Sequence, residues 1–355
     1  MKQVVQYPLS LLDCRLVRLS GYNRRLQDTD LRLAEMQQRL TATQQRLAEA
    51  EAKLADSARR EQRAREVTQL QPLALPLVDG AFFIQVKIDY PDIFRPNPPH
   101  YTYRHVLEVL KRHQAAILRN AEALRPAMYG PVMNNLPTAM PNPVDPYWNN
   151  GMFERDDARA VYALTGHVKP KRIIEVGSGQ STKFFRKAIT DFNLDCELLC
   201  IDPVPRAEIR SVADKILYQH IKDVDLALFD TLDDHDILFW DGSHIVYNGT
   251  DTTHFYLNVL PGIKKKVLVH VHDIQLPHEY EAGYSAHYYN EQYMLATLLL
   301  NSIEWAPVFP VFWLKRLGQL QHGGVSFWMS RQALLPGLEQ PSTLLLEGPA
   351  RPSED

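Results

Sequence analysis

From residue 151 onward, short apolar segments alternate with segments of helical spacing, and this alternation constrains the fold more than any other feature of the chain. Apolar runs of about four to eight residues that alternate with helices are typical of parallel strands buried on both faces. The pattern predicts an α/β fold, a doubly wound Rossmann-like sheet with helices on both faces. The five predicted strands are RIIEV (172–176), ELLCID (197–202), KILYQ (215–219), DILFWD (236–241) and KVLVHVHD (266–273).

Two more strands are predicted near the end of this region, after a helix around 288–301. They are WAPVFPVFW (305–313) and VSFWMS (325–330). Because they lie close together in the sequence, we expect an antiparallel hairpin at one edge of the sheet.

A glycine-rich segment, EVGSGQST (175–182), joins the first strand to a predicted helix. Gly177 and Gly179 allow a sharp turn and let a ligand approach the backbone without a Cβ in the way. A dinucleotide-binding loop would carry a third glycine where this chain has Ser181. The alternative is a tight strand-to-helix connection without a ligand.

Carboxylates follow the ends of successive predicted strands. Glu175, Asp202, Asp241 and Asp273 end the first, second, fourth and fifth strands, and Asp223 follows the third. Because ligands bind at the carboxyl ends of strands in open α/β sheets, we expect these acids to converge on one pocket. Each acid alone could instead be a surface residue or a helix cap, and for Asp223 that reading is favoured.

Two histidines accompany the last two acids: His244 follows Asp241, and His272 precedes Asp273. A histidine near its ordinary pKa of about 6.5 can accept a proton from a reacting alcohol. A bound cation could instead lower the pKa of that alcohol. In the alternative reading Asp241 caps a turn, His244 fills a polar pocket, and at least one of His270 and His272 is structural.

The N-terminal part carries a leucine heptad in a stretch without proline or glycine, which predicts a coiled-coil helix over 26–70 after an N-terminal segment 1–25. A single solvated amphipathic helix is the alternative. The heptad leucines are Leu26, Leu33, Leu40, Leu47 and Leu54.

Residues 71–150 hold half of the chain's 24 prolines and are predicted to form an accessory region before a catalytic domain 151–330 and a flexible tail 331–355. Within this region we expect a strand at AFFIQVKID (81–89) and a helix beginning at 103.

Composition excludes some classes of function. A net charge of −3 provides no field suited to nucleic acid, and no apolar run approaches the roughly 20 residues of a membrane span. The cysteines Cys14, Cys196 and Cys200 form no zinc-type pair, which predicts a reducing, cytoplasmic setting.

Several segments together resemble a known family. These are PYWNN, RDDARAVYALTGHVKPKRIIEVGSGQST, CIDPVPR, DILFWDGSH, VHDIQLP and NEQYMLATLLL. They are similar to the class I S-adenosylmethionine-dependent methyltransferases of the methyltransferase-24 type, a group similar to O-methyltransferases of macrolide-sugar and cephalosporin pathways. The resemblance covers about residues 145–330. An antiparallel last strand is also the mark of this family's sheet, whereas dinucleotide dehydrogenases keep that edge parallel.

The resemblance implies a role for each matching position. Asp202 binds the ribose hydroxyls of S-adenosylmethionine, Glu175 meets the amino group of its methionine moiety, and Asp223 stands near the adenine. His244 corresponds to a general base in some relatives, while Asp241 and Asp273 correspond to carboxylates that hold Mg²⁺. His272 departs from the metal-dependent pattern, which has an acid there. The positions expected to line the cofactor are Glu175, Gly177, Ser178, Gly179, Ser181, Asp202, Asp223 and Asp241.

The sequence thus predicts a methyltransferase acting on oxygen of a sugar, glycan or other hydroxylated acceptor. His244 or His272 would take the proton, Asp241 and Asp273 would orient the acceptor directly or through a cation, and the coiled coil would form a homo-oligomer. One alternative is an NAD-dependent dehydrogenase, which the missing third glycine and the absence of an obvious Tyr-x-x-x-Lys pair oppose. The other is a catalytically degenerate cofactor-binding scaffold.

Overall fold

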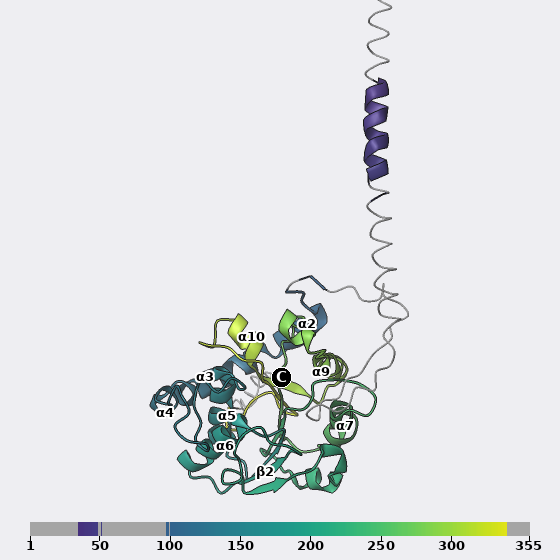
Figure 1. Ribbon diagram of the computed structural model, residues 1–355. Coiled ribbons are helices and arrows are strands. Elements are labelled where there is room, and N and C mark those ends of the chain that lie inside the picture. The colour runs from purple at the N-terminus through teal and green to yellow at the C-terminus, as the bar shows by residue number, and fades with distance from the viewer. Residues whose placement is uncertain (1–34, 49–50, 52–96, 99, 339–355) are drawn as a thin grey trace, which may run out of the picture. The chain divides into compact units, whose positions relative to one another are not determined.

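A seven-stranded sheet with the order β3-β2-β1-β4-β5-β7-β6 forms the centre of the unit Pro96–Asp355 (Figure 1). This computed structural model describes residues 35–48, 51, 97–98 and 100–338. The strands are β1 (Arg172–Val176), β2 (Glu197–Ile201), β3 (Lys215–Leu217), β4 (Ile237–Trp240), β5 (Leu268–Val271), β6 (Ala306–Pro310) and β7 (Phe327–Ser330).

The first five strands pair in parallel, and the last strand, β7, runs antiparallel to both of its neighbours, β5 and β6. Both the doubly wound sheet and its antiparallel last strand are therefore confirmed. The prediction was wrong over 311–313, where the chain leaves the strand and forms α10 (Val311–Arg316). Pro310 has no N–H to continue a ladder, and the helix buries Val311 and Trp313 instead.

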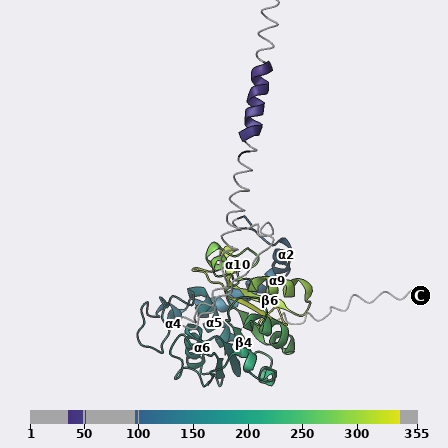
Figure 2. The same ribbon diagram turned by 45° about the vertical axis from the view of Figure 1, so that its right-hand side comes forward.

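Helices cover both faces of the sheet. In both views α5 and α6 lie on one side of it and α9 on the other (Figures 1 and 2). The α-helices of this unit are α2 (Arg104–Arg112), α3 (Gln114–Met128), α4 (Pro131–Asn134), α5 (Arg155–Val168), α6 (Gln180–Asp191), α7 (Asp251–His254), α8 (Ala282–Ala286), α9 (Glu291–Asn301) and α10. Short 3-10 or π segments are η2 (Ile221–Asp223), η3 (Leu226–Thr231), η4 (Phe255–Val259) and η5 (Leu260–Gly262).

The helix predicted from residue 103 is present but interrupted at His113, which separates α2 from α3. Ile117 and Leu124 on α3 are buried in the same hydrophobic core as the sheet strands. The described part of the predicted accessory region therefore shares the core of the sheet. The domain boundary near residue 150 stays a prediction.

In the N-terminal unit, residues 35–48 are helical. Met36, Leu40 and Leu47 are exposed on this helix, the two leucines at 59% each. The other leucines of the predicted seam, the strand predicted at 81–89 and most of the predicted tail lie outside the described residues. No helix in the described ranges is long and apolar enough to cross a membrane.

Candidate functional site

The two glycines of the loop after β1 have different reasons to be glycine. Gly177 has φ +80°, and a Cβ there would lie 1.9 Å from the backbone oxygen of Asp241. A Cβ on Gly179 would meet nothing within 4 Å. Gly177 thus permits the close approach of the β1 and β4 exits, while Gly179 leaves open space beside the N-terminus of α6, where a ligand could approach the backbone.

Glu175 connects the loop after β1 to α6. Its carboxylate is fully buried and accepts hydrogen bonds from the hydroxyls of Ser181 (2.5 Å) and Thr182 (2.6 Å), with Cys200 Sγ at 3.3 Å. Burial raises the pKa of Glu175 to about 7, against the opposing effect of these donors. Both side chains are buried and hold the loop onto α6, and the contact of Glu175 with the methionine moiety stays a prediction.

Asp202, just beyond β2, lies beside this loop as predicted. Its Oδ2 accepts hydrogen bonds from the backbone N–H of Ser178 (2.7 Å) and from its hydroxyl (3.2 Å), while Oδ1 accepts from Val204 N–H (2.8 Å). A carboxylate can accept about four hydrogen bonds, so Asp202 keeps acceptor capacity toward a ligand. Asp223 ends η2 and is exposed.

The structure brings Asp241, His244, His272 and Asp273 into one cluster at the exits of β4 and β5. Nε2 of His244 lies 3.1 Å from Oδ1 of Asp241 and 3.2 Å from Oδ2 of Asp273. Nδ1 of His272 lies 3.5 Å from an oxygen of each carboxylate. Ligand atoms of Asp241, His244 and Asp273 all lie within 4.8 Å of one another, a grouping that could hold a metal ion.

Two further carboxylates stand behind the histidines. Oε2 of the fully buried Glu291, at the start of α9, lies 2.8 Å from Nδ1 of His244, and its Oε1 accepts a 2.5 Å hydrogen bond from the indole of Trp240. Oδ2 of the fully buried Asp157, in the first turn of α5, lies 3.6 Å from Nε2 of His272. Neither Glu291 nor Asp157 was among the site residues predicted from the sequence, although both are acids in the first turn of a helix.

The backbone holds His244 and Asp273 in an unusual conformation. Both are non-glycine residues with positive φ, +59° and +55°. The backbone N–H groups of Asn290 and Glu291 donate to the carbonyl of His244 at 3.1 and 3.2 Å. Such backbone strain persists only where the surrounding structure over-determines it, and it concentrates at functional sites.

Charge in the cluster shifts both histidines away from the ordinary pKa assumed from the sequence. Burial lowers the pKa of His244, but hydrogen bonds with Asp241 and Glu291 outweigh it and raise that pKa to about 10. Burial also opposes the charge on His272, yet Asp241 and Asp273 raise its pKa well above the ordinary value. Burial favours the neutral acid at Asp241, but His272 and His244 lower its pKa below the ordinary range. These raised pKa values favour the imidazolium form of both rings, and an imidazolium ion cannot accept a proton.

His270 is the structural histidine that the sequence analysis expected. Its ring stacks on Phe239 with centroids 3.7 Å apart, and its Nε2 lies 2.8 Å from the hydroxyl of Ser326. Burial lowers its pKa well below the ordinary value, so the ring is neutral.

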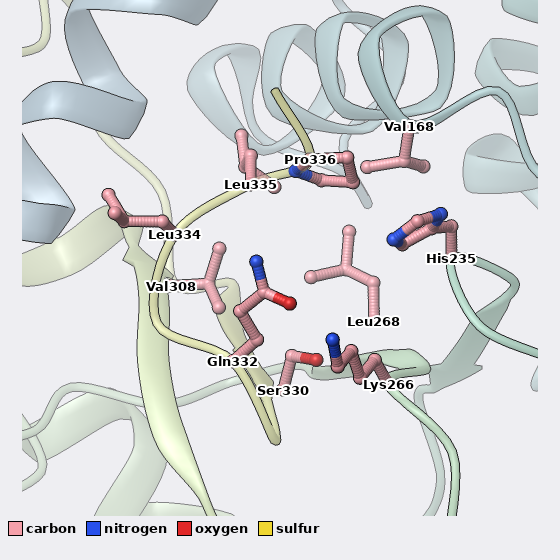
Figure 3. Close-up of a pocket in the computed structure, with 10 residues that line it drawn as sticks. All are labelled: Val168, His235, Lys266, Leu268, Val308, Ser330, Gln332, Leu334, Leu335 and Pro336. Carbon is pink, nitrogen blue, oxygen red and sulfur yellow. The ribbon is translucent and has the colours of Figure 1, made fainter. Parts of the chain in front are cut away.

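A hollow of about 520 Å³ opens beside the cluster. Its lining includes His272, Asp273, Tyr284, Phe153 and Trp148. A smaller hollow of about 240 Å³ adjoins it and shares Tyr284 in its lining. A third pocket, whose lining includes His235, Lys266 and Leu335, encloses only about 20 Å³ (Figure 3). That volume suits about one water molecule.

Residues 174–274 match the family described as methyltransferase domain, of the methyltransferase-24 type. This segment carries a methyltransferase domain. The methyltransferase domain includes the loop after β1, Asp202 and the cluster at the exits of β4 and β5, whereas Asp157 and Glu291 lie outside the matched residues.

Over 95 residues the chain is 36% identical to an uncharacterized protein of Archaeoglobus fulgidus. The alignment covers 25% of this chain and 43% of that relative, so the chain spans less than half of the relative's length.

Solved methyltransferases are also similar to the chain. The O-methyltransferase TomG from Streptomyces achromogenes, involved in tomaymycin synthesis, is 16% identical with a TM-score of 0.32, covering 59% of this chain and 89% of TomG. The plantazolicin methyltransferase BpumL is 10% identical with a TM-score of 0.30, covering 63% of this chain and 100% of BpumL.

Proposed function

We propose that the chain is an S-adenosylmethionine-dependent O-methyltransferase acting on a sugar, glycan or other hydroxylated small molecule. The observation that carries this proposal is the convergence of the glycine loop, Asp202 and the cluster of Asp241, His244, His272 and Asp273 at one edge of the sheet of a methyltransferase domain. Ligands of open α/β sheets bind at this edge.

The methyl donor would lie along the loop after β1. The open space at Gly179 admits the ligand to the backbone, and the acceptor site that remains on Asp202 suits a ribose hydroxyl. The N-terminus of α6 favours the carboxylate of the methionine moiety, because the first N–H groups of a helix attract negative charge. Asp223 is exposed and remains the candidate contact for adenine.

The acceptor would enter through the hollow of about 520 Å³, which reaches His272 and Asp273. Tyr284 lines this hollow, and the ring of Tyr289 lies 4.6 Å from that of His244. Aromatic rings with a polar end combine apolar contact with hydrogen bonding, which suits the faces and hydroxyls of a sugar.

The cluster would orient the acceptor hydroxyl and receive its proton. His244 and His272 can act as the base only in their neutral form, so their raised pKa values require another positive charge beside Asp241 and Asp273. A divalent cation supplies such charge and lowers the pKa of a coordinated hydroxyl. Asp241, His244 and Asp273 have the donor atoms and the spacing to hold one.

The proposal also includes the setting of the enzyme. The exposed Leu40 and Leu47 support association of protomers through the N-terminal helix, and the near-neutral charge gives no support for a nucleic-acid partner. A cytoplasmic location is part of the same proposal, since the small number of cysteines suits a reducing compartment.

Binding of S-adenosylhomocysteine to the full chain, measured by calorimetry, tests the function. We expect the wild type and Asp195→Asn, a control at an exposed acid before β2, to bind equally. Asp202→Asn should bind about 10- to 100-fold more weakly, because hydrogen bonds to a charged group contribute about 1.5–3 kcal/mol. Thermal unfolding checks that each variant is folded.

Binding of NAD by the wild type without any response to S-adenosylhomocysteine would reverse the proposal in favour of a dehydrogenase. Methyl transfer is then assayed with labelled donor on a panel of glycans and hydroxylated metabolites. If the chain binds S-adenosylhomocysteine but methylates none of them, a degenerate scaffold is favoured.

A further inference from the structure

We propose that Asp241, His244, His272 and Asp273 form a site for a transition-metal dication of the Mn²⁺, Fe²⁺, Co²⁺ and Zn²⁺ class, in preference to Mg²⁺. This inference deepens the proposed function, because it specifies the ion held at the same cluster.

The first argument is the set of inward-facing donor atoms. Nε2 of His244 and Nδ1 of His272 both approach the pair of carboxylates, within 3.1–3.2 Å and 3.5 Å respectively. Two imidazole nitrogens thus face the same pair of carboxylates, and the ligand atoms of Asp241, His244 and Asp273 all lie within 4.8 Å of one another. Mg²⁺ prefers oxygen ligands and keeps several waters, whereas imidazole suits the transition metals.

The second argument is what lies behind each ring. A carboxylate oxygen of Glu291 lies 2.8 Å from Nδ1 of His244, within hydrogen-bond distance, and an oxygen of Asp157 lies 3.6 Å from Nε2 of His272. Carboxylates behind metal-ligating histidines fix the tautomer and the orientation of the ring and raise the basicity of the ligand. Glu291 makes this contact with His244, whereas Asp157 stands behind His272 at 3.6 Å, beyond hydrogen-bond distance. In both residues the other ring nitrogen faces Asp241 and Asp273.

The third argument concerns an unsatisfied atom. Nε2 of the buried His272 has no hydrogen-bond partner among the described residues, because Asp157 at 3.6 Å is too far for one. A buried polar group without a partner is costly. A metal ion at Nδ1 would fix the tautomer that carries its proton on Nε2, the nitrogen that faces Asp157.

The fourth argument is charge. Four carboxylates, Asp157, Asp241, Asp273 and Glu291, surround two imidazoles in a largely buried volume. Buried charges require compensation, by protons on both rings or by a dication. A dication bound by neutral rings supplies the same two positive charges at the centre of the cluster.

Metal binding to the full chain tests the inference. Affinities for Co²⁺ and Mg²⁺ are measured by calorimetry for the wild type, for His272→Glu and for the control His105→Gln, an exposed histidine on α2. We expect Co²⁺ to bind more tightly than Mg²⁺ to the wild type and the control. His272→Glu replaces an imidazole ligand with a carboxylate and should weaken Co²⁺ binding by at least about tenfold. The affinity for Mg²⁺ should not fall.

Pulsed EPR of the Mn²⁺-loaded wild type gives a second readout that needs no variant. Nitrogen couplings from coordinated imidazole are expected. Three results would overturn the inference and leave the proposed function intact. They are the absence of nitrogen couplings, equal affinity for Co²⁺ and Mg²⁺, and no metal binding by a protein that binds S-adenosylhomocysteine. If the metal binds as expected but S-adenosylhomocysteine does not bind, the proposed function is wrong and the metal site is retained.

Discussion

At the scale of single residues, the two glycines of the loop after β1 separate stability from ligand binding. Gly177 is fixed by its φ of +80° and by the 1.9 Å approach of an added Cβ to the Asp241 carbonyl, whereas Gly179 borders open space. Strained backbone costs about 1–3 kcal/mol before any clash is counted. The same substitution should therefore have different consequences two residues apart.

We expect Gly177→Ala to lower the free energy of unfolding by more than about 1–3 kcal/mol, because strain and the backbone clash add. Gly179→Ala should lose less stability and should instead weaken binding of S-adenosylhomocysteine, since its methyl group enters the space proposed for the ligand. Urea unfolding and calorimetry measure the two effects. Equal loss of stability in both variants would contradict this assignment.

The site residues predicted from the sequence were those at strand ends, because the neighbouring apolar residues in the sequence identify the strands. Asp202, Asp241 and Asp273 follow apolar runs, so their common edge could be inferred from the parallel sheet. The carboxylates behind the rings could not, because Glu291 lies 47 positions from His244 and meets it only through the packing of α9. The inward burial of Glu175 was equally invisible, since it depends on the hydroxyls of the following helix.

At the scale of elements, the strands were predicted best and their ends least well. Continuous apolar character identified β1 to β5, but it also extended the strand at 305–313 into what is α10. An apolar run does not distinguish a buried strand from a buried helix, and Pro310 marks the change. The sequence did not indicate what the N-terminus of α9 contacts, yet Glu291 there binds Trp240 and His244 at the end of β4.

Replacing Glu291 tests this anchor. Glu291→Gln leaves a single acceptor oxygen for the Trp240 indole and the His244 imidazole, so one N–H should lose its partner at a cost of about 1–3 kcal/mol in the free energy of unfolding. Glu304→Gln is the matched control, because Glu304 is exposed and pairs with Arg331 at the surface. A loss no greater than that of the control, measured by urea unfolding, would refute a stabilising anchor.

At the scale of the whole molecule, the N-terminal helix makes a prediction about assembly. Exposed leucines seven residues apart are costly in an isolated helix but form the seam of a coiled coil. We expect the full chain to be oligomeric by light scattering, and Leu40→Glu with Leu47→Glu to dissociate it. Gln38→Glu with Gln45→Glu, the same charge change on the opposite side of the heptad, should leave the mass unchanged. A monomeric wild type would refute association.

The contact between Gly177 and Asp241 has a mechanical consequence. Asp241 also donates its backbone N–H to the carbonyl of Val176 at 2.9 Å. The segment proposed to receive the methyl donor and the segment proposed to carry the ion ligands therefore pack together without a side chain between them. A shift of either segment toward the other would meet backbone atoms directly. Binding of the metal ion should therefore change the affinity for the methyl donor, and binding of the donor should change the affinity for the ion by the same factor.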